Sequence, residues 1–241
     1  MAKDQALLCV ALDAMEPEKA VELAKELGSS VDIIKIGLGL FNRGGLDIVK
    51  ALVDTGASVF LDLKLHDIPS QVGDAVGAIT KLGVHYLTVH TGGGGEMLAA
   101  AVEQRNAASA QYAPGFPKLL GVTVLTSLGP ENLREVGAKA NVEEVVRDRV
   151  KLAHRSGIDG IVCSPADLDF INEIPESQGL LKVTPGIRPP NYGEDDQNRV
   201  ATPGKAVAAG ANVLVVGRPI KLAENPRQAA EGIRKAMESS S

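Results

Sequence analysis

The chain has 241 residues, of which 44% are hydrophobic, 23% charged and only 3% aromatic, and its net charge is −5 at pH 7. This length can bury a large core in one or two domains, and the composition excludes a disordered or fibrous chain. The acidic balance argues against a nucleic-acid-binding surface, which normally carries a basic excess.

Two further features concern the compartment. Cys9 and Cys163 each lie inside an apolar run, as expected of small buried thiols in a reducing environment. The first apolar run is short and is bounded by Asp4 and Asp13, which is typical neither of a signal peptide nor of a membrane span. We therefore expect a soluble, cytoplasmic protein with no membrane segment.

Short apolar runs alternate with amphipathic helical stretches, without a change in composition that would mark a linker. In the first unit, an apolar strand precedes a helix that has Pro17 in its first turn and Gly28 after its end. The pattern predicts strands at 7–12, 31–36, 58–64, 85–90, 118–125, 160–163, 181–184 and 212–216. It predicts helices at 17–27, 46–54, 70–82, 96–106, 142–156, 165–172, 203–209 and 226–237.

This rhythm of about eight strand-helix units, one every 25–30 residues or so, predicts an α/β fold, a (β/α)₈ TIM barrel that forms a single domain over residues 1–241. A doubly wound open sheet is the alternative. Such a sheet usually has fewer strands and often carries a glycine fingerprint after its first strand, where this chain has Ala-Leu-Asp-Ala at 11–14.

The third strand and the turn after it, SVFLDLKLHDIPSQ, concentrate charged residues. Side chains two apart on a strand share a face, so Asp62 and Lys64 project together while Leu61 and Leu63 point the other way. Asp67 follows just beyond the strand. Charges at the end of an apolar strand are costly unless they pair with each other or with a substrate. A strand-end salt bridge would explain this motif if it stood alone.

The carboxyl ends of the other predicted strands are also polar, whereas their amino ends carry small or ordinary polar residues. In a barrel the carboxyl ends converge on one mouth, and catalytic residues come from several strands. This one-sided polarity predicts an active site, because both rims of a barrel meet water. The residues at these ends are Asp13, Lys35, Asp62, Lys64, His90, Thr126, Ser127, Thr184, Gly217 and Arg218.

The charges at this rim alternate in sign, so Asp13, Lys35, Asp62, Lys64 and Asp67 can form a chain of carboxylates and ammonium groups. Flanking carboxylates favour a protonated lysine, so Lys64 would act as a proton donor more readily than as a base. Pairing also fixes its position, which a general acid requires. Lys35 alone could be a lysine that extends to solvent.

A phosphate site is predicted after the last two strands. Gly217 lets a ligand approach backbone N–H groups, and Arg218 offers a guanidinium fork to a dianion. The glycine run at 92–95 could also cradle a phosphate, or it could be a tight, closely packed turn.

The segment 186–202 is long and polar, as expected of a lid or binding loop, although it could simply be solvated. In it, Gln197 with Arg188 or Arg199 could close over an anionic ligand. The adjacent acids at 195–196 have no His, Cys or Asp cluster with ligand spacing beside them, so we predict no metal site.

These motifs together resemble the orotidine 5′-monophosphate decarboxylase family, whose signature is D-x-K-x-x-D followed by Ile-Pro. The resemblance is to the shorter bacterial type, and it runs through the whole chain in the expected order. It implies a (β/α)₈ homodimer that decarboxylates orotidine 5′-monophosphate to uridine 5′-monophosphate in de novo pyrimidine biosynthesis, without a cofactor. The matching segments are FLDLKLHDIP at 60–69, VALDA at 10–14, KIG at 35–37, VTVLTS at 122–127, VTPGIRP at 183–189, DQ at 196–197 and VVGRP at 215–219.

The resemblance assigns catalytic roles to residues of the charged chain. Lys64 would donate a proton to C6 of the pyrimidine, and Asp62 would lie against the departing carboxylate. Lys35 would pair with Asp62 and reach the ribose, and Asp13 would hold a ribose hydroxyl. Asp67, with Ile68, would reach into the partner subunit's site.

The resemblance also implies a set of binding residues. Thr126 and Ser127 would contact the pyrimidine ring. The residues that would hold the 5′-phosphate are Arg188, Gln197, Gly217 and Arg218. In one departure, Gln71 stands where many relatives have Thr, so a cross-subunit contact there is not carried over.

Two other functions fit parts of the pattern. The D-x-K-x-x-D arrangement also resembles that of a related aldolase, 3-hexulose-6-phosphate synthase, in which the acids help to bind magnesium. A non-catalytic phosphosugar-binding barrel would need the phosphate site but not the proton donor. The Ile-Pro after Asp67 and the Thr-Ser at 126–127 favour the decarboxylase over the aldolase.

Overall fold

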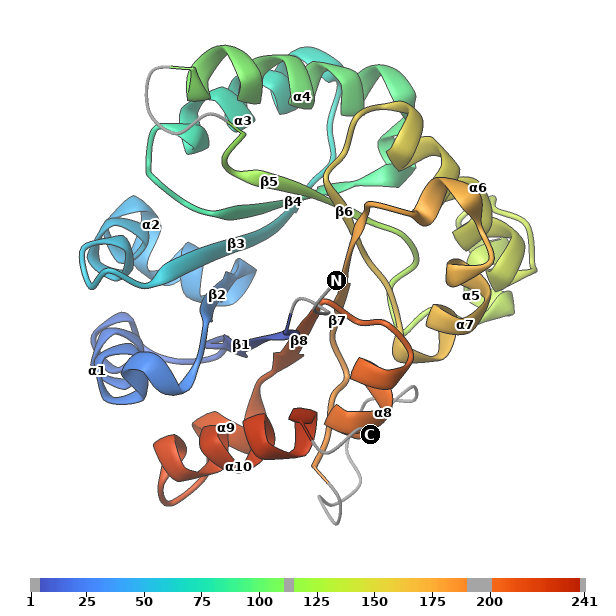
Figure 1. Cartoon of the computed structure of the whole chain (residues 1–241). Coiled ribbons are helices and arrows are strands. Elements are labelled where there is room, and N and C mark those ends of the chain that lie inside the picture. Colours follow the sequence, from blue (N-terminus) through green and yellow to red (C-terminus); the bar gives the residue numbers. More distant parts are fainter. Residues whose placement is uncertain (1–4, 111–114, 190–200, 239–241) are drawn as a thin grey trace.

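The strands close into a single barrel. A computed structural model describes residues 5–110, 115–189 and 201–238. Within these ranges each strand pairs in parallel with the next along the chain, and β8 pairs with β1 to complete the ring (Figure 1). The predicted (β/α)₈ barrel is therefore confirmed, and the open sheet is excluded. The strands are β1 Leu7–Ala11, β2 Ile33–Gly37, β3 Ser58–Leu65, β4 Tyr86–His90, β5 Lys118–Val122, β6 Gly160–Val162, β7 Leu181–Thr184 and β8 Val213–Val216.

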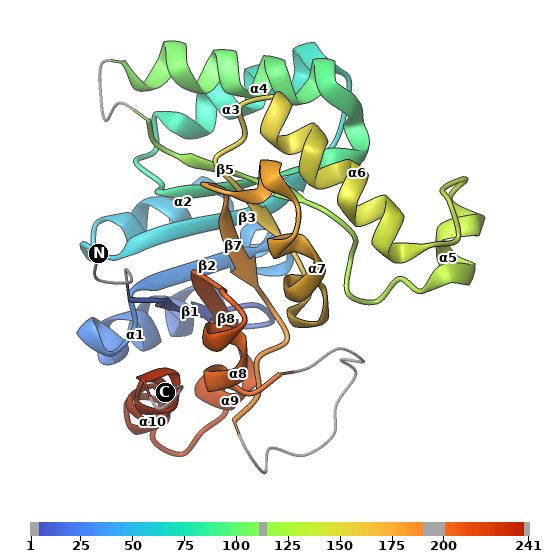
Figure 2. The same ribbon diagram turned by 45° about the vertical axis from the view of Figure 1, so that its right-hand side comes forward.

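Helices surround the strands on the outside (Figures 1 and 2). Many begin with proline in the first turn, where the missing N–H costs no hydrogen bond. None in the described part of the chain is long and apolar enough to cross a bilayer. The helices are α1 Pro17–Leu27, α2 Leu38–Val53, α3 Pro69–Thr80, α4 Gly94–Ser109, α5 Pro130–Glu135, α6 Val142–Arg155, α7 Leu168–Asn172, α8 Pro203–Ala208, α9 Arg218–Lys221 and α10 Pro226–Glu238.

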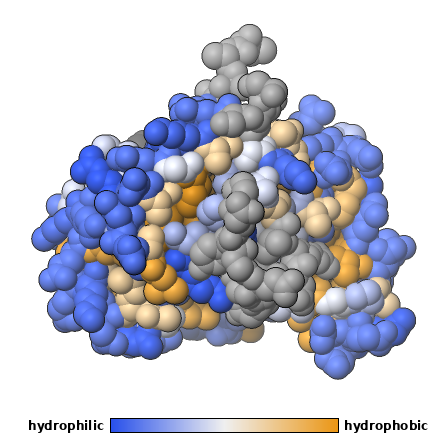
Figure 3. All heavy atoms as spheres, turned by 90° about the horizontal axis from the view of Figure 1, so that it is seen from below, coloured by the Kyte–Doolittle hydropathy of each residue, from blue (hydrophilic) through white to orange (hydrophobic). Residues whose placement is uncertain are grey.

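The alternation of side chains along each strand separates two hydrophobic cores. On β8, Val213 and Val215 belong to a small cluster inside the barrel, whereas Leu214 and Val216 belong to the larger layer between strands and helices. The inner cluster fills the barrel below its mouth, so the mouth has an apolar floor. The surface in Figure 3 is mostly hydrophilic, with hydrophobic side chains between the polar ones.

Three helices differ from the prediction. Helix α2 begins at Leu38 and not at residue 46, and it is kinked at Gly45, which has a φ of 55°. Within this helix, Gly44 lies so close to Ile48 that a Cβ there would lie 2.7 Å from the Cβ of Ile48. The short helices α5 and α9 were not expected, because each covers little more than one turn.

The glycine run at 92–95 forms the tight turn that was one of its two predicted structures. A 3₁₀ turn spans Thr91–Gly93, and α4 begins at Gly94, which has a φ of 84°. A Cβ on Gly93 would lie 2.1 Å from the Met97 sulfur, so this position admits no side chain without a shift.

At the opposite end from the mouth, a buried ion pair ties α4 to the strands. Arg105 is 5% exposed and donates through Nη1 to Asp159 Oδ2 at 2.7 Å and to the Pro117 carbonyl at 2.9 Å. The same carboxylate accepts from the Leu119 N–H at 2.8 Å. Burial of a charged guanidinium at this depth is costly, and the paired carboxylate of Asp159 offsets that cost.

We predict that Asp159→Ala lowers the free energy of unfolding by about 3–5 kcal/mol, because it leaves the buried Arg105 without its counter-ion. Urea denaturation measures this change. The control is Glu131→Ala, which removes an exposed ion pair to Arg134 and should cost less than about 0.5 kcal/mol. Equal effects from both variants would show that the Arg105 pair is not a stabilising contact.

Candidate active site

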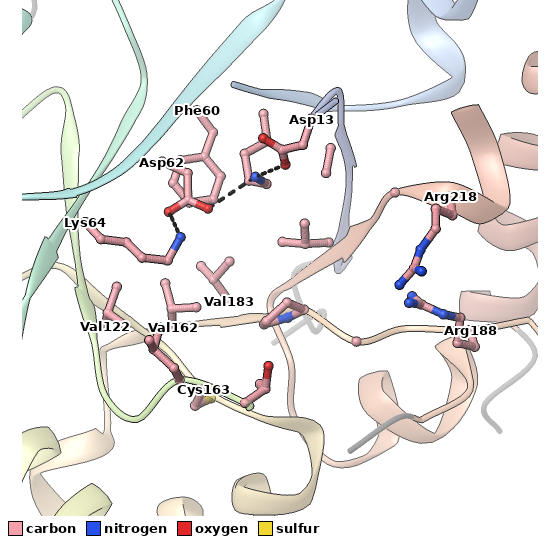
Figure 4. A pocket seen from close by; sticks show the side chains of 18 of the residues that line it. Asp13, Phe60, Asp62, Lys64, Val122, Val162, Cys163, Val183, Arg188 and Arg218 are labelled. Carbon is pink, nitrogen blue, oxygen red and sulfur yellow. Dashed lines mark hydrogen bonds and ion pairs between the residues drawn. The ribbon is translucent and has the colours of Figure 1, made fainter. Parts of the chain in front are cut away.

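A chain of alternating charges crosses the mouth of the barrel. Lys35 Nζ lies 2.7 Å from Asp13 Oδ2 and 3.2 Å from Asp62 Oδ2, and Lys64 Nζ lies 2.8 Å from Asp62 Oδ1 (Figure 4). Strand register brings these residues together, because β1 pairs Ala11 with Lys35 and β2 pairs Gly37 with Asp62. Four members of the predicted chain thus meet.

The chain is largely buried, and its charges sustain one another. Burial acts to lower the pKa of Lys35, but the carboxylates of Asp62 and Asp13 outweigh it and raise that pKa above its ordinary value. Burial likewise acts to raise the pKa of Asp62, but the Lys35 and Lys64 ammonium groups and hydrogen bonds from Lys64 and Thr88 hold that pKa below its ordinary value. Both groups are therefore charged at neutral pH.

Lys64 is held in an unusual backbone conformation. Between two paired positions β3 advances four residues, from Leu61 to Leu65, while β4 advances two, from Leu87 to Val89. Lys64 lies in this bulge with a φ of 51°, a left-handed conformation that costs a non-glycine residue about 1–3 kcal/mol. Strand bulges commonly redirect a side chain at an active site. Here the lysine points into the mouth beside Asp62 (Figure 4).

Two histidines lie next to Lys64. The rings of His66 and His90 stack with their centroids 5.0 Å apart. Burial and the nearby charges of Arg149, His66 and Lys64 lower the pKa of His90 to about 4. His90 is therefore neutral at pH 7 and adds no charge to this side of the mouth.

The charged chain forms one end of a pocket of about 380 Å³. Its wall is apolar and comes from the inward-facing ends of several strands. A flat, uncharged ring suits such a wall. The apolar and thiol side chains that line it include Phe60, Val122, Val162, Cys163, Val183 and Val215.

Cations occupy the other end of the pocket. The guanidinium groups of Arg188 and Arg218 face each other there, away from Lys64 (Figure 4). Lys221 also lines the pocket and donates to the Asp13 carbonyl. Burial lowers the pKa of Lys221, and the nearby Arg218 and Lys35 lower it further. Cations that converge in this way suit a dianion such as a phosphate monoester.

Asp67 and Ile68 lie outside the pocket of their own chain. The Asp67 carboxylate accepts from the Ile68 N–H at 2.7 Å, and within the described ranges it forms no ion pair. Ile68 is 61% exposed. Leu38, which follows β2 at the same carboxyl-end rim of the barrel, is 52% exposed. The described residues of the single chain leave more than half of each of these apolar side chains uncovered.

The structure thus assembles most of the predicted site residues but not all of them. Ser127, Asp67 and Ile68 are not among the residues that line the pocket, although Ser127 lies in the same turn as Thr126. Gln197 lies outside the described residues. The segment that contains it is joined at its base, where the Arg188 N–H donates to the Ala201 carbonyl at 2.9 Å. The predicted residues that line the pocket are Asp13, Lys35, Asp62, Lys64, Thr126, Arg188, Gly217 and Arg218.

Two residues of the site, Lys221 and Thr88, were not predicted from the sequence. Lys221 follows Arg218 by three residues, so a helical turn after β8 places both on one face, but that turn was not predicted. Thr88 bonds both Asp62 and Lys64, yet a threonine in a strand carries no signal of its own.

Together the fold and the site define a class, that of barrel enzymes that bind an anionic substrate at the carboxyl ends of the strands. A sequence model described as the Orotidine 5′-phosphate decarboxylase / HUMPS family matches residues 6–233. The chain belongs to this family.

Individual relatives cover nearly the whole chain. It is 41% identical over 228 residues to the orotidine 5′-phosphate decarboxylase of Lactobacillus acidophilus, which covers 94% of this chain and 96% of that one. It is 43% identical over 233 residues to the enzyme of that name from Syntrophotalea carbinolica, covering 95% and 94%. The crystal structure of the L. acidophilus enzyme superposes with a TM-score of 0.85 at 37% identity, covering 97% of this chain and 100% of that one.

We predict that Gly37→Ala destabilises the protein by about 1–3 kcal/mol, because a Cβ there would lie 1.9 Å from Asp13 Oδ1 and would break the contact of Asp13 with Lys35. Its φ of −99° suits alanine, so the effect is steric. Urea denaturation measures the change.

The matched control is Gly39→Ala on the exposed face of α2, where a Cβ would meet nothing closer than Arg43 Nη1 at 3.4 Å. Alanine favours a helix, so this variant should be up to about 1 kcal/mol more stable than the unmodified protein. A gain in stability in both variants would show that the position of the Asp13 carboxylate does not require the absence of a side chain at Gly37.

Proposed function

We propose that the protein decarboxylates orotidine 5′-monophosphate to uridine 5′-monophosphate, without a cofactor, in de novo pyrimidine biosynthesis in the cytoplasm. The family supports this reaction. So do the protein's relatives, which are named orotidine 5′-phosphate decarboxylase and match this chain over almost their whole length. The observation that carries the proposal is the division of the pocket, with Lys64 and Asp62 at one end and Arg188 and Arg218 at the other.

This division fits a nucleotide in one orientation. The 5′-phosphate lies between Arg188 and Arg218, near the backbone of Gly217. The pyrimidine lies against the apolar wall with C6 towards Lys64, and Thr126 lies beside it. The ribose lies between them, where Asp13 and Lys35 can bond its hydroxyl groups. Ser127, and Gln197 in the segment 186–202, complete the predicted contacts to the base and to the phosphate.

The charges then perform the chemistry. When the C6–carboxylate bond breaks, carbon dioxide leaves and the electron pair stays on C6, where no neighbouring group can delocalise it. The Lys64 ammonium group faces that carbon, so its attraction grows as negative charge develops. Lys64 then donates its proton to C6. Asp62 holds the ammonium group in place, and Lys35 holds Asp62.

We also include a homodimer in the proposal, in which Asp67 and Ile68 reach the neighbouring subunit's site. Ile68 and Leu38 are apolar and exposed at the carboxyl-end rim of the barrel, and a second copy of the chain would bury them. A carboxylate that arrives there from the partner would extend the chain of alternating charges beyond Lys64.

The metal-dependent aldolase, 3-hexulose-6-phosphate synthase, remains the alternative. The description of the matching family names this second type of enzyme, abbreviated as HUMPS, beside the decarboxylase. In the described part of the chain, no three His, Cys, Asp or Glu side chains cluster closely enough to hold a metal ion. The two functions differ in their response to a chelator, which makes the choice testable.

We predict that Lys64→Ala lowers the turnover of orotidine 5′-monophosphate by at least about 1,000-fold, because it removes both the stabilising charge and the proton donor. The fall in substrate absorbance measures turnover, with EDTA present throughout. Lys25→Ala on α1, an exposed lysine far from the pocket, is the control and should keep full activity. Loss of unmodified activity in EDTA would favour the aldolase, and substantial activity of Lys64→Ala would refute the role of Lys64.

We predict that Lys64→Ala and Asp67→Ala chains complement each other when they are co-expressed. In the mixed dimer one site receives Lys64 from one chain and Asp67 from the other, so about a quarter of all sites are intact after random pairing. Activity near a quarter of the unmodified value is expected. Asp62→Ala with Lys64→Ala is the control, since both changes damage the site of their own chain. If neither mixture gained activity, each site would be built from one chain.

A further inference from the structure

Thr88 is an uncharged residue that contacts two members of the charged chain, Asp62 and Lys64. It is the middle residue of β4 and is fully buried. Its neighbours Leu87 and Val89 face the helices, so Thr88 faces the barrel interior on the side of β3. A buried hydroxyl must find partners, and those of Thr88 are both residues of the site.

The Thr88 hydroxyl uses its donor and its acceptor in different directions. Its Oγ1 accepts from the backbone N–H of Lys64 at 2.8 Å and donates to Asp62 Oδ1 at 3.0 Å. The direction follows from the groups themselves, because an N–H can only donate and a carboxylate can only accept. One side chain thus holds both the backbone of Lys64 and the carboxylate of Asp62.

The bulge in β3 explains why this contact is needed. Ladder pairs join Leu61 to Leu87 and Leu65 to Val89, so the bulge takes Lys64 out of the regular pairing with β4. Its N–H takes Thr88 Oγ1 as partner in place of a backbone carbonyl. Such a contact helps to hold a left-handed residue in a conformation that it would otherwise leave.

We propose that Thr88 is a positioning residue for the decarboxylation: its hydroxyl locks the bulge and the Asp62 carboxylate in the arrangement that aims the Lys64 ammonium group into the pocket. The proposal rests on the proposed function, because it assigns a task to Thr88 in that reaction. Thr88 acts through Lys64 and Asp62 and is not among the residues that line the pocket.

The same contact ties Thr88 to the pH dependence of the reaction. The charged groups that face Asp62 are Lys35 from β2 and Lys64 from β3, with Asp13 beyond Lys35. Loss of the Thr88 hydrogen bond would raise the pKa of Asp62 from its depressed value, although both lysines remain. The proposed reaction requires an ionised Asp62, so kcat falls when that carboxylate is protonated at low pH. This fall, the acid limb of the pH profile of kcat, then moves to higher pH.

The test compares Thr88→Val, which keeps the shape and removes the hydroxyl, with Thr88→Ser, which keeps the hydroxyl. We expect Thr88→Val to lower kcat by about 10- to 100-fold, the loss typical of one hydrogen bond to a charged group, while KM changes by less than about threefold. Its acid limb should move to higher pH. Thr88→Ser should restore kcat to within about threefold of the unmodified enzyme, with the original acid limb.

Thr80→Val is the matched control, because Thr80 is also buried but its hydroxyl donates to the Val76 carbonyl within α3, away from the charged chain. It should leave kcat and the pH profile unchanged. If Thr88→Val does not fold, Thr88→Cys replaces it, with the same loss expected because a thiol is a weak donor.

An unchanged kcat and acid limb in Thr88→Val would overturn the proposal. Equal losses in Thr88→Val and Thr88→Ser would also overturn it, since the methyl group and not the hydroxyl would then matter. Failure of the proposed function looks different, because the unmodified protein itself would not consume orotidine 5′-monophosphate.

Discussion

The buried ammonium group of Lys35, held between the carboxylates of Asp13 and Asp62, is the interaction on which the site depends. The side chain is 8% exposed, and an ion at that depth loses hydration worth roughly several kcal/mol. Nearby acids must offset this loss if the ion is to stay charged. Both acids are present at hydrogen-bonding distance. Their positions are set by strand register and by the absence of a side chain at Gly37. The barrel therefore fixes Lys35, and Lys35 fixes its two neighbours.

This arrangement extends outwards to Lys64. Asp62 shares one oxygen between Lys64 and Thr88 and offers the other to Lys35, so its carboxylate has little freedom to rotate. Lys64 in turn lies on a bulge whose conformation is costly for a lysine. A cation held in this way requires little reorganisation when charge develops opposite it, which is how electrostatic catalysis gains its effect. At the far end of the pocket, Arg188 and Arg218 would, in the proposed reaction, bind the part of the substrate that does not react, so that their binding energy supports the chemical step.

Much of this could be predicted from the sequence, for a physical reason. Alternation along a strand places Ile33, Lys35 and Gly37 on one face, and parallel strands bring their carboxyl ends to one rim, so the polar ends had to meet. The register shift between Leu61 and Leu65 could not be predicted, because it depends on how β3 pairs with β4. Thr88 was missed for the same reason. Lys221 was missed because a helix of a single turn, such as α9, leaves no periodic pattern. The roles assigned to the site residues all stay predictions. Those of Asp67, Ile68 and Gln197 also concern a second subunit or residues outside the described ranges.

The most direct test of this account is a crystal structure of the protein with uridine 5′-monophosphate bound. We expect the phosphate to lie between Arg188 and Arg218 and the pyrimidine to lie against Phe60 and Val183. Lys64 Nζ should then lie within roughly 3–3.5 Å of C6, the separation expected of reacting atoms. A nucleotide bound in the reverse orientation, or a Lys64 side chain turned away from C6 while still paired with Asp62, would contradict it.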